Sequence, residues 1–200
     1  LAELEAERPV LILQNLGTGM TPIWHYAVVV GYQPENRMFI LRSGDKERHR
    51  IKRRAFLRSW KRADYWGFVA LRPGDLPAIA DAERYLRAVA ALESAGDVGT
   101  AREAYQAATK HWPGSALAWL ALGNASYADG DLEAAQRAYE ESVRADPNSV
   151  IAMNNLSQVY LDRGYRDDAE ATIHAALSMV DADDPLYGLL LQTAAAIAGP

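Results

Sequence analysis

A histidine near the start of an apolar strand is the side chain of this sequence whose neighbours suggest catalysis. His25 is the second residue of the valine-rich stretch 24–32. The hairpin described below places it opposite Gly44, or opposite Ser43 or Asp45 if the register shifts by one residue. A hydroxyl or carboxylate there would orient the imidazole, as the third member of a catalytic triad orients the base that activates the nucleophile. The alternative is a core histidine without a chemical role.

The elements that position this histidine are read from alternation and turn chemistry. Gln33–Asn36 is turn sequence, and pairing of Tyr32 with Arg37 across it gives the register used above. Phe56, Leu57 and Trp60 follow at helical spacing. The predicted elements are strands at 9–14, 24–32, 37–42 and 65–71, a helix at 52–63 and a linker at 72–77.

The remainder of the chain repeats itself with a period of 34 residues, over 82–115, 116–149 and 150–183. Each repeat holds a bulky residue at its fourth position, a glycine at its fifteenth and an alanine at its twentieth. In the middle repeat these are Trp119, Gly130 and Ala135. This period and residue order resemble the tetratricopeptide repeat, a pair of helices that stacks into a solenoid.

The resemblance to tetratricopeptide repeats implies a groove lined by the first helix of each repeat. Asn124 and Asn155 match the asparagines with which related repeats hold a peptide main chain, since an amide both donates and accepts. Leu120 stands where a carboxylate-clamping cation would be, so no partner with a free C-terminal carboxylate is implied. The alternative is that the asparagines only bridge helices. The implied groove residues are Leu117, Leu120, Asn124, Tyr127, Asn154, Asn155, Gln158 and Leu161.

Residues 8–73 resemble the C-terminal half of a papain-fold cysteine peptidase of the bacteriocin-processing, double-glycine-leader type. The resemblance is carried by the His25–Gly31 segment, the strand before it, the Phe56/Trp60 helix and the closing Trp66–Leu71 strand. It implies that His25 descends from the general base. The orienting position falls at Ser43, with Asp45 two residues later. It also implies a bacterial periplasmic or envelope location.

The chain contains no cysteine, so the peptidase nucleophile of that family would come from a segment preceding Leu1. We therefore expect a peptide-binding module attached to the histidine-bearing half of a peptidase-like domain that is inactive as the chain stands. The alternative is an active cysteine peptidase when that segment is present. The expected fold class is α+β: a partial papain-like antiparallel sheet over 1–77, then an all-α solenoid of three repeats over 78–200.

Composition argues against several other functions. No metal or other cofactor is expected, because cysteine is absent and His49, His111 and His174 show no ligand spacing. No apolar run is long enough to cross a bilayer. Ten of the 21 residues from Arg42 to Arg62 are basic. We interpret them as a solvated helix face and expect no nucleic-acid partner, the alternative being a surface with base-stacking aromatics.

The last segment, 184–198, is predicted to be a helix that caps the solenoid, with Asp184 as its N-cap and Pro185 in its first turn. It is apolar for a terminal helix. The expectation is that it packs on a further segment or on another subunit, so a homo-oligomer through this helix is a hypothesis.

Overall fold

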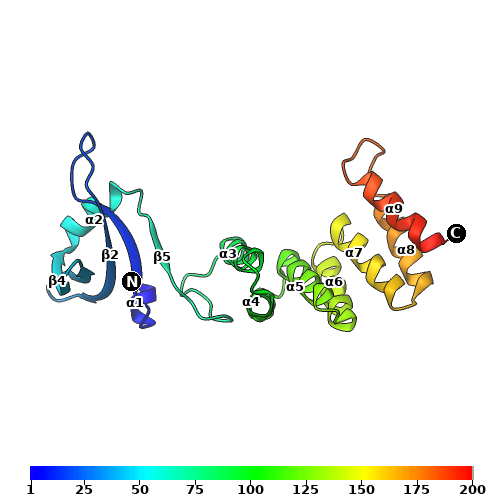
Figure 1. Ribbon diagram of the computed structural model, residues 1–200, viewed down its shortest axis with the longest axis horizontal. Helices are drawn as coiled ribbons and strands as arrows, with labels where there is room; N and C mark the ends of the chain where they lie inside the picture. Colours follow the sequence, from blue (N-terminus) through cyan, green and yellow to red (C-terminus); the bar gives the residue numbers. More distant parts are fainter. Residues whose placement is uncertain (200) are drawn as a thin grey trace. The chain divides into compact units, whose positions relative to one another are not determined.

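The computed structural model describes residues 1–199, which form two compact units. The first, called here the sheet unit, comprises residues 1–72 and 76–80. The second, the helical unit, comprises residues 73–75 and the chain from Asp81 onward. The chain is therefore α+β, with an antiparallel sheet followed by a helical array (Figure 1).

The sheet unit is built on a five-stranded sheet in the order β4-β3-β2-β1-β5, with every neighbouring pair antiparallel. The valine-rich strand lies at the centre, where both of its edges are paired. The elements of the unit are α1 (Ala2–Glu5), β1 (Val10–Asn15), β2 (Trp24–Gln33), β3 (Met38–Ser43), β4 (Lys46–Lys52), α2 (Arg53–Lys61) and β5 (Gly67–Val69).

The core of the sheet unit lies between α2 and one face of the sheet. Phe56 of α2 packs on Phe39 of β3 with ring centroids 4.2 Å apart, and Trp60 extends the aromatic contact one turn further. Ile12, 1% exposed, and Leu41, 1% exposed, complete this apolar layer. Phe56 and Trp60, one helical turn apart, thus both lie on the side of α2 that faces the sheet.

The β2–β3 hairpin differs from its expected register. Tyr32 pairs with Phe39 rather than with Arg37, because the turn runs through Arg37, which has φ 50°. The register then shifts between Val29 and Gly31, at a β-bulge that offsets part of the error. The turn has the expected four residues but lies one residue later in the chain, at 34–37 instead of 33–36. The bulge nevertheless returns Ser43 to the neighbourhood of His25.

The basic stretch after Arg42 is only partly helical, which corrects the expectation of a helix face. Residues Lys46–Lys52 form β4, an edge strand whose Ile51 packs against the core. In this strand His49 and Ile51 are partly buried, and the charged residues between and beside them are exposed. The alternation typical of a strand was therefore present in the sequence, but the many arginines and lysines obscured it.

In the described part of the helical unit there are seven helices, each of which packs against the next in the chain; α5 also contacts α3, and α9 also contacts α7. Figure 1 shows them as successive antiparallel pairs followed by α9. Their bounds are α3 (Ala82–Ser94), α4 (Val98–His111), α5 (Ala116–Ala128), α6 (Leu132–Ala145), α7 (Val150–Asp162), α8 (Arg166–Leu177) and α9 (Tyr187–Ala198).

The turn inside each helix pair is set by a glycine, as the 34-residue pattern predicted. Gly96, Gly130 and Gly164 have φ of 97°, 77° and 82°, in the left-handed region where a side chain is strained. The next helix is then capped by an aspartate in two of the three pairs: Asp97 accepts from Thr100 N and Asp131 from Ala134 N.

Close approach of α5 and α6 depends on Gly123. A Cβ atom placed there would lie 2.4 Å from Cε1 of Tyr139, whose side chain is 2% exposed. The absence of a side chain at Gly123 therefore lets the tyrosine ring lie against the backbone of α5, where its hydroxyl donates to Asn124. This contact places a polar group of α6 among the side chains of α5 and α7.

The terminal helix begins later than predicted, at Tyr187 instead of residue 184. Asp184 does accept a backbone N–H, but from Leu186 at 2.7 Å, in the turn that precedes the helix. Leu190 and Ile197 are buried against the cluster that contains Met153 of α7, whereas Leu189 and Leu191 are each 46% exposed. The predicted oligomer through α9 stays a prediction.

Candidate binding pocket

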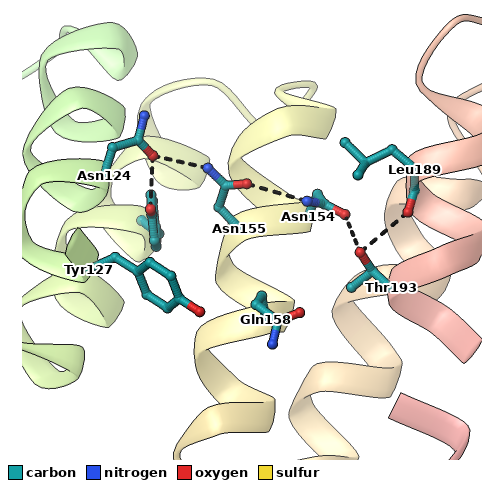
Figure 2. Close-up of a pocket in the computed structure, with 8 residues that line it drawn as sticks. Asn124, Tyr127, Asn154, Asn155, Gln158, Leu189 and Thr193 are labelled. Atoms are coloured by element: carbon teal, nitrogen blue, oxygen red, sulfur yellow. Dashed lines mark hydrogen bonds between the residues drawn. The ribbon is translucent and has the colours of Figure 1, made fainter. Parts of the chain in front are cut away.

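A pocket of about 390 Å³ opens between α5, α7 and α9. Helix α5 supplies Asn124 and Tyr127 to its wall, and Tyr139 reaches it from α6. Figure 2 shows the polar side chains of the three helices turned toward the same hollow. The full lining is Asn124, Tyr127, Tyr139, Asn154, Asn155, Gln158, Leu189 and Thr193.

A row of hydrogen bonds joins the helices that form this pocket (Figure 2). Tyr139 donates its hydroxyl to Asn124 Oδ1 at 2.8 Å, and Asn155 Nδ2 donates to the same oxygen at 3.0 Å. Asn154 Nδ2 then donates to Asn155 Oδ1 at 3.3 Å, and Thr193 donates to Asn154 Oδ1 at 2.8 Å. The row links α6, α5, α7 and α9 and fixes the orientation of every amide in it.

Two amide groups at the pocket keep unused hydrogen-bonding capacity. Asn124 accepts through Oδ1, but its Nδ2 donates to no protein group among residues 1–199. Gln158 donates through Nε2 to Asp162 Oδ1 at 2.8 Å, and within the same residues its Oε1 accepts from no protein group. The pocket thus presents an unused donor group at Asn124 and an unused acceptor at Gln158, the pair that a peptide unit complements.

Both tyrosines of the pocket are held in the protonated form. Burial raises the pKa of Tyr139 to about 12. Its hydrogen bond to Asp162, followed by burial, raises the pKa of Tyr127 above its usual value. At neutral pH each hydroxyl is therefore a donor, Tyr139 to Asn124 and Tyr127 to Asp162 Oδ2 at 2.7 Å. The direction of each bond is fixed because the amide oxygen of Asn124 and the carboxylate of Asp162 can only accept.

The pocket contains five of the groove residues that the sequence predicted and leaves out three. Asn124, Tyr127, Asn154, Asn155 and Gln158 line it. The other three are apolar: Leu117 is 51% exposed outside it, Leu120 packs beside Tyr139 and Leu156, and Leu161 joins the Met153 cluster. Of the five, Asn154 is 8% exposed and bonded through both its nitrogen and its oxygen.

Sequence reasoning missed three lining residues, Tyr139, Leu189 and Thr193. Tyr139 stands at the twenty-fourth position of the middle repeat, where the pattern has a large residue, yet a buried tyrosine hydroxyl needs a polar partner and so indicates where polar groups converge. Thr193 was read as part of a capping helix. The available signal was Thr193, which with Gln192 interrupts the apolar run 189–198.

The sheet unit brings together two of its three candidate residues. His25 Nε2 lies 2.7 Å from Ser43 Oγ, and both side chains are half-buried. Asp45 is exposed in the β3–β4 turn and has no hydrogen bond to His25. The contact can orient an imidazole, as inferred from the hairpin, although the partner is the hydroxyl and not the carboxylate.

Among residues 1–199, no three histidine, aspartate or glutamate side chains are grouped so that they could hold a metal ion. No helix in that range is long and apolar enough to cross a membrane.

The helical unit matches known protein families. Residues 86–148 match one family model described as a tetratricopeptide repeat, and residues 126–193 match a second model of the same description. The chain is 31% identical over 87 residues to the peroxisomal targeting signal receptor of Yarrowia lipolytica (strain CLIB 122 / E 150). That match covers 44% of this chain and 14% of the receptor, so the chain spans a small part of this relative.

Two solved structures show the same helical fold. The type III secretion chaperone SycD of Yersinia enterocolitica, in complex with a peptide of the translocator YopD, has a TM-score of 0.54 and 18% identity, covering 58% of this chain and 91% of that one. The TPR2B domain of yeast Sti1, in a complex with pHsp70, has a TM-score of 0.54 and 19% identity, covering 58% and 95%. At such identities the likeness shows the fold alone.

Proposed function

Because the C-terminal helices are tetratricopeptide repeats, we propose that this chain is a binding module that holds an extended peptide or protein segment in the pocket between α5, α7 and α9. The proposal depends above all on the hydrogen-bond row, which orients Asn124 so that its Nδ2 remains free at the pocket. A peptide carbonyl is the acceptor that this donor needs. Gln158 Oε1 supplies the matching acceptor for a peptide N–H.

Preorganisation supports binding at this position. Ordering a side chain on association costs about 0.5–1.5 kcal/mol, and here the row has already ordered Asn124 and Asn155 in the free protein. The solved relatives supply the analogy: the SycD and Sti1 structures hold a YopD peptide and pHsp70 respectively. The same fold in this chain would therefore present a ready-made peptide site.

The test must remove the free donor without breaking the row. Asn124→Asp does so, because the carboxylate still accepts from Tyr139 and Asn155 but donates nothing. Asn148→Asp in the exposed loop before α7 is the matched control, since it makes the same chemical change outside the pocket. The probe is a library of capped random nonapeptides captured on the immobilised chain.

The captured peptides with no ionisable side chain are then measured by isothermal titration. We expect Asn124→Asp to weaken them by about 1–3 kcal/mol, the cost of an unmet hydrogen bond, and Asn148→Asp to leave them unchanged. Capture that is indifferent to Asn124→Asp would remove the pocket as the binding site.

A second candidate is the cysteine peptidase implied by the papain-like resemblance of residues 8–73. One observation favours it: Ser43, at the orienting position of that resemblance, lies 2.7 Å from His25 Nε2. The nucleophile would come from a segment preceding Leu1. The test is to express the reading frame with its upstream sequence and apply a thiol-directed active-site probe. Labelling lost on His25→Ala supports a peptidase, and labelling that survives this change opposes it.

A further inference from the structure

The pocket is lined by uncharged side chains, but two of them hydrogen-bond to a carboxylate beside it. None of its eight lining residues is an acid or a base. Asp162, at the end of α7, accepts from Tyr127 through Oδ2 at 2.7 Å and from Gln158 through Oδ1 at 2.8 Å. Two lining residues thus hold this carboxylate at the border of the pocket, with one oxygen bonded to each helix.

No cation neutralises this carboxylate within residues 1–199. Asp162 takes part in none of the ion pairs of that range. Its neighbour Arg163 is directed elsewhere, toward Gln136 of α6 and over the ring of Tyr165 at 5.2 Å. The negative charge at the pocket is therefore uncompensated by the protein.

The charge of the whole helical unit has the same sign. Residues 81–200 contain 18 acidic and 8 basic residues, a net charge of −10. Such a surface raises the local concentration of cationic ligands and opposes anionic ones. The charge of Asp162 and the net charge of the helical unit therefore both favour a positively charged partner.

We propose that the pocket is specific for a segment that carries a lysine or arginine side chain, whose cationic end pairs with Asp162. The aliphatic stem of such a side chain would lie along the ring of Tyr127, which is 38% exposed. A segment ending in a free carboxylate, or an acidic segment, would meet Asp162 without any cation in the lining. This inference rests on the proposed function and adds the chemistry of the ligand.

The experiment uses the same capped random nonapeptide library on the full chain, with the residues of the captured peptides counted by sequencing. The test variant is Asp162→Asn, which keeps an acceptor for Tyr127 while removing the charge. Glu170→Gln on α8 is the matched control, because it is exposed and removes the same charge away from the pocket. Asn124→Asp reports whether capture uses the pocket at all.

The expected result is that lysine and arginine are enriched about threefold over glutamine, as an exposed ion pair permits. The enrichment should vanish in Asp162→Asn, persist in Glu170→Gln and shrink as salt rises toward about 1 M. Capture that weakens for neutral peptides in Asn124→Asp but shows no preference, or prefers glutamate, overturns this inference alone. Capture that does not respond to Asn124→Asp overturns the proposed function with it.

Discussion

Thr193 of α9 donates its hydroxyl to Asn154 Oδ1 of α7 at 2.8 Å, and both side chains are 8% exposed. This bond joins the terminal helix to the row of amides in the pocket, so α9 forms a wall of the pocket as well as an end to the array. Thr193→Val keeps the shape of the side chain but leaves Asn154 with an unmet acceptor. We expect it to lower the free energy of unfolding by about 1–3 kcal/mol, measured by urea titration.

The matched control for that change is Thr172→Val on α8. The hydroxyl of Thr172 is exposed and bonds only to Asp168 O in its own helix. Its loss should alter stability by no more than about 0.5 kcal/mol. Equal effects of the two substitutions would mean that the Thr193–Asn154 bond contributes nothing specific.

Gly123→Ala should destabilise the helical unit even though alanine is the better helix former. The new Cβ would lie 2.4 Å and 2.5 Å from two carbons of the buried Tyr139 ring, which has no room to move. We expect a loss of about 1–3 kcal/mol in urea unfolding, as for other overpacked sites. Gly99→Ala in α4 is the control, because nothing lies within 4 Å of its Cβ position. That change should stabilise by about 0.5–1 kcal/mol; a gain at Gly123 as well would refute the close contact.

Gly130→Val tests backbone strain in isolation from packing. The residue has φ 77°, and a Cβ there would meet no atom within 4 Å. The β-branched side chain should therefore lower the melting temperature through the left-handed backbone alone, at a cost of about 1–2 kcal/mol. Gly130→Asn should cost less, since asparagine tolerates this conformation. Identical melting curves for the valine variant and the parent chain would contradict the turn assignment.

The helical fold was predictable because the same sequence pattern occurs in three successive repeats. Glycines at one spacing and alanines at another imply the same turn and the same crossing in every pair, so an error in one repeat is corrected by the next. The start of α9 had no such support. Asp184 and Pro185 look like a helix start, but the aspartate closes a turn two residues before Tyr187 instead.

The pocket was predictable only on the side that belongs to the repeat. Asn124 and Asn155 occupy groove positions, whereas the contribution of Thr193 depends on how α9 folds back against α7, which no repeat pattern describes. In the sheet unit, the strand pattern predicted that His25 approaches residues 43–45, at the end of β3 and in the turn after it. It could not specify Ser43, because the bulge between Val29 and Gly31 and the turn at Arg37 change the register in ways that depend on tertiary packing.

Alkaline pH should lower the stability of the helical unit, because the pKa values of two of its tyrosines are raised. Burial is the main cause that raises the pKa of Tyr139 to about 12, and burial with a hydrogen bond to Glu140 raises that of Tyr160 to about 12, from an ordinary value of 10.0. A raised pKa means that the folded state favours the protonated hydroxyl. The stability from this source is therefore complete below about pH 10 and is lost as pH rises toward 12. Melting temperatures followed by circular dichroism should be level up to pH 10 and then fall.

Tyr139→Phe removes one of the titrating groups, so the decline in its melting temperature between pH 10 and 12 should be shallower than that of the parent chain. An equally steep decline would mean that Tyr139 ionises without cost in the folded state.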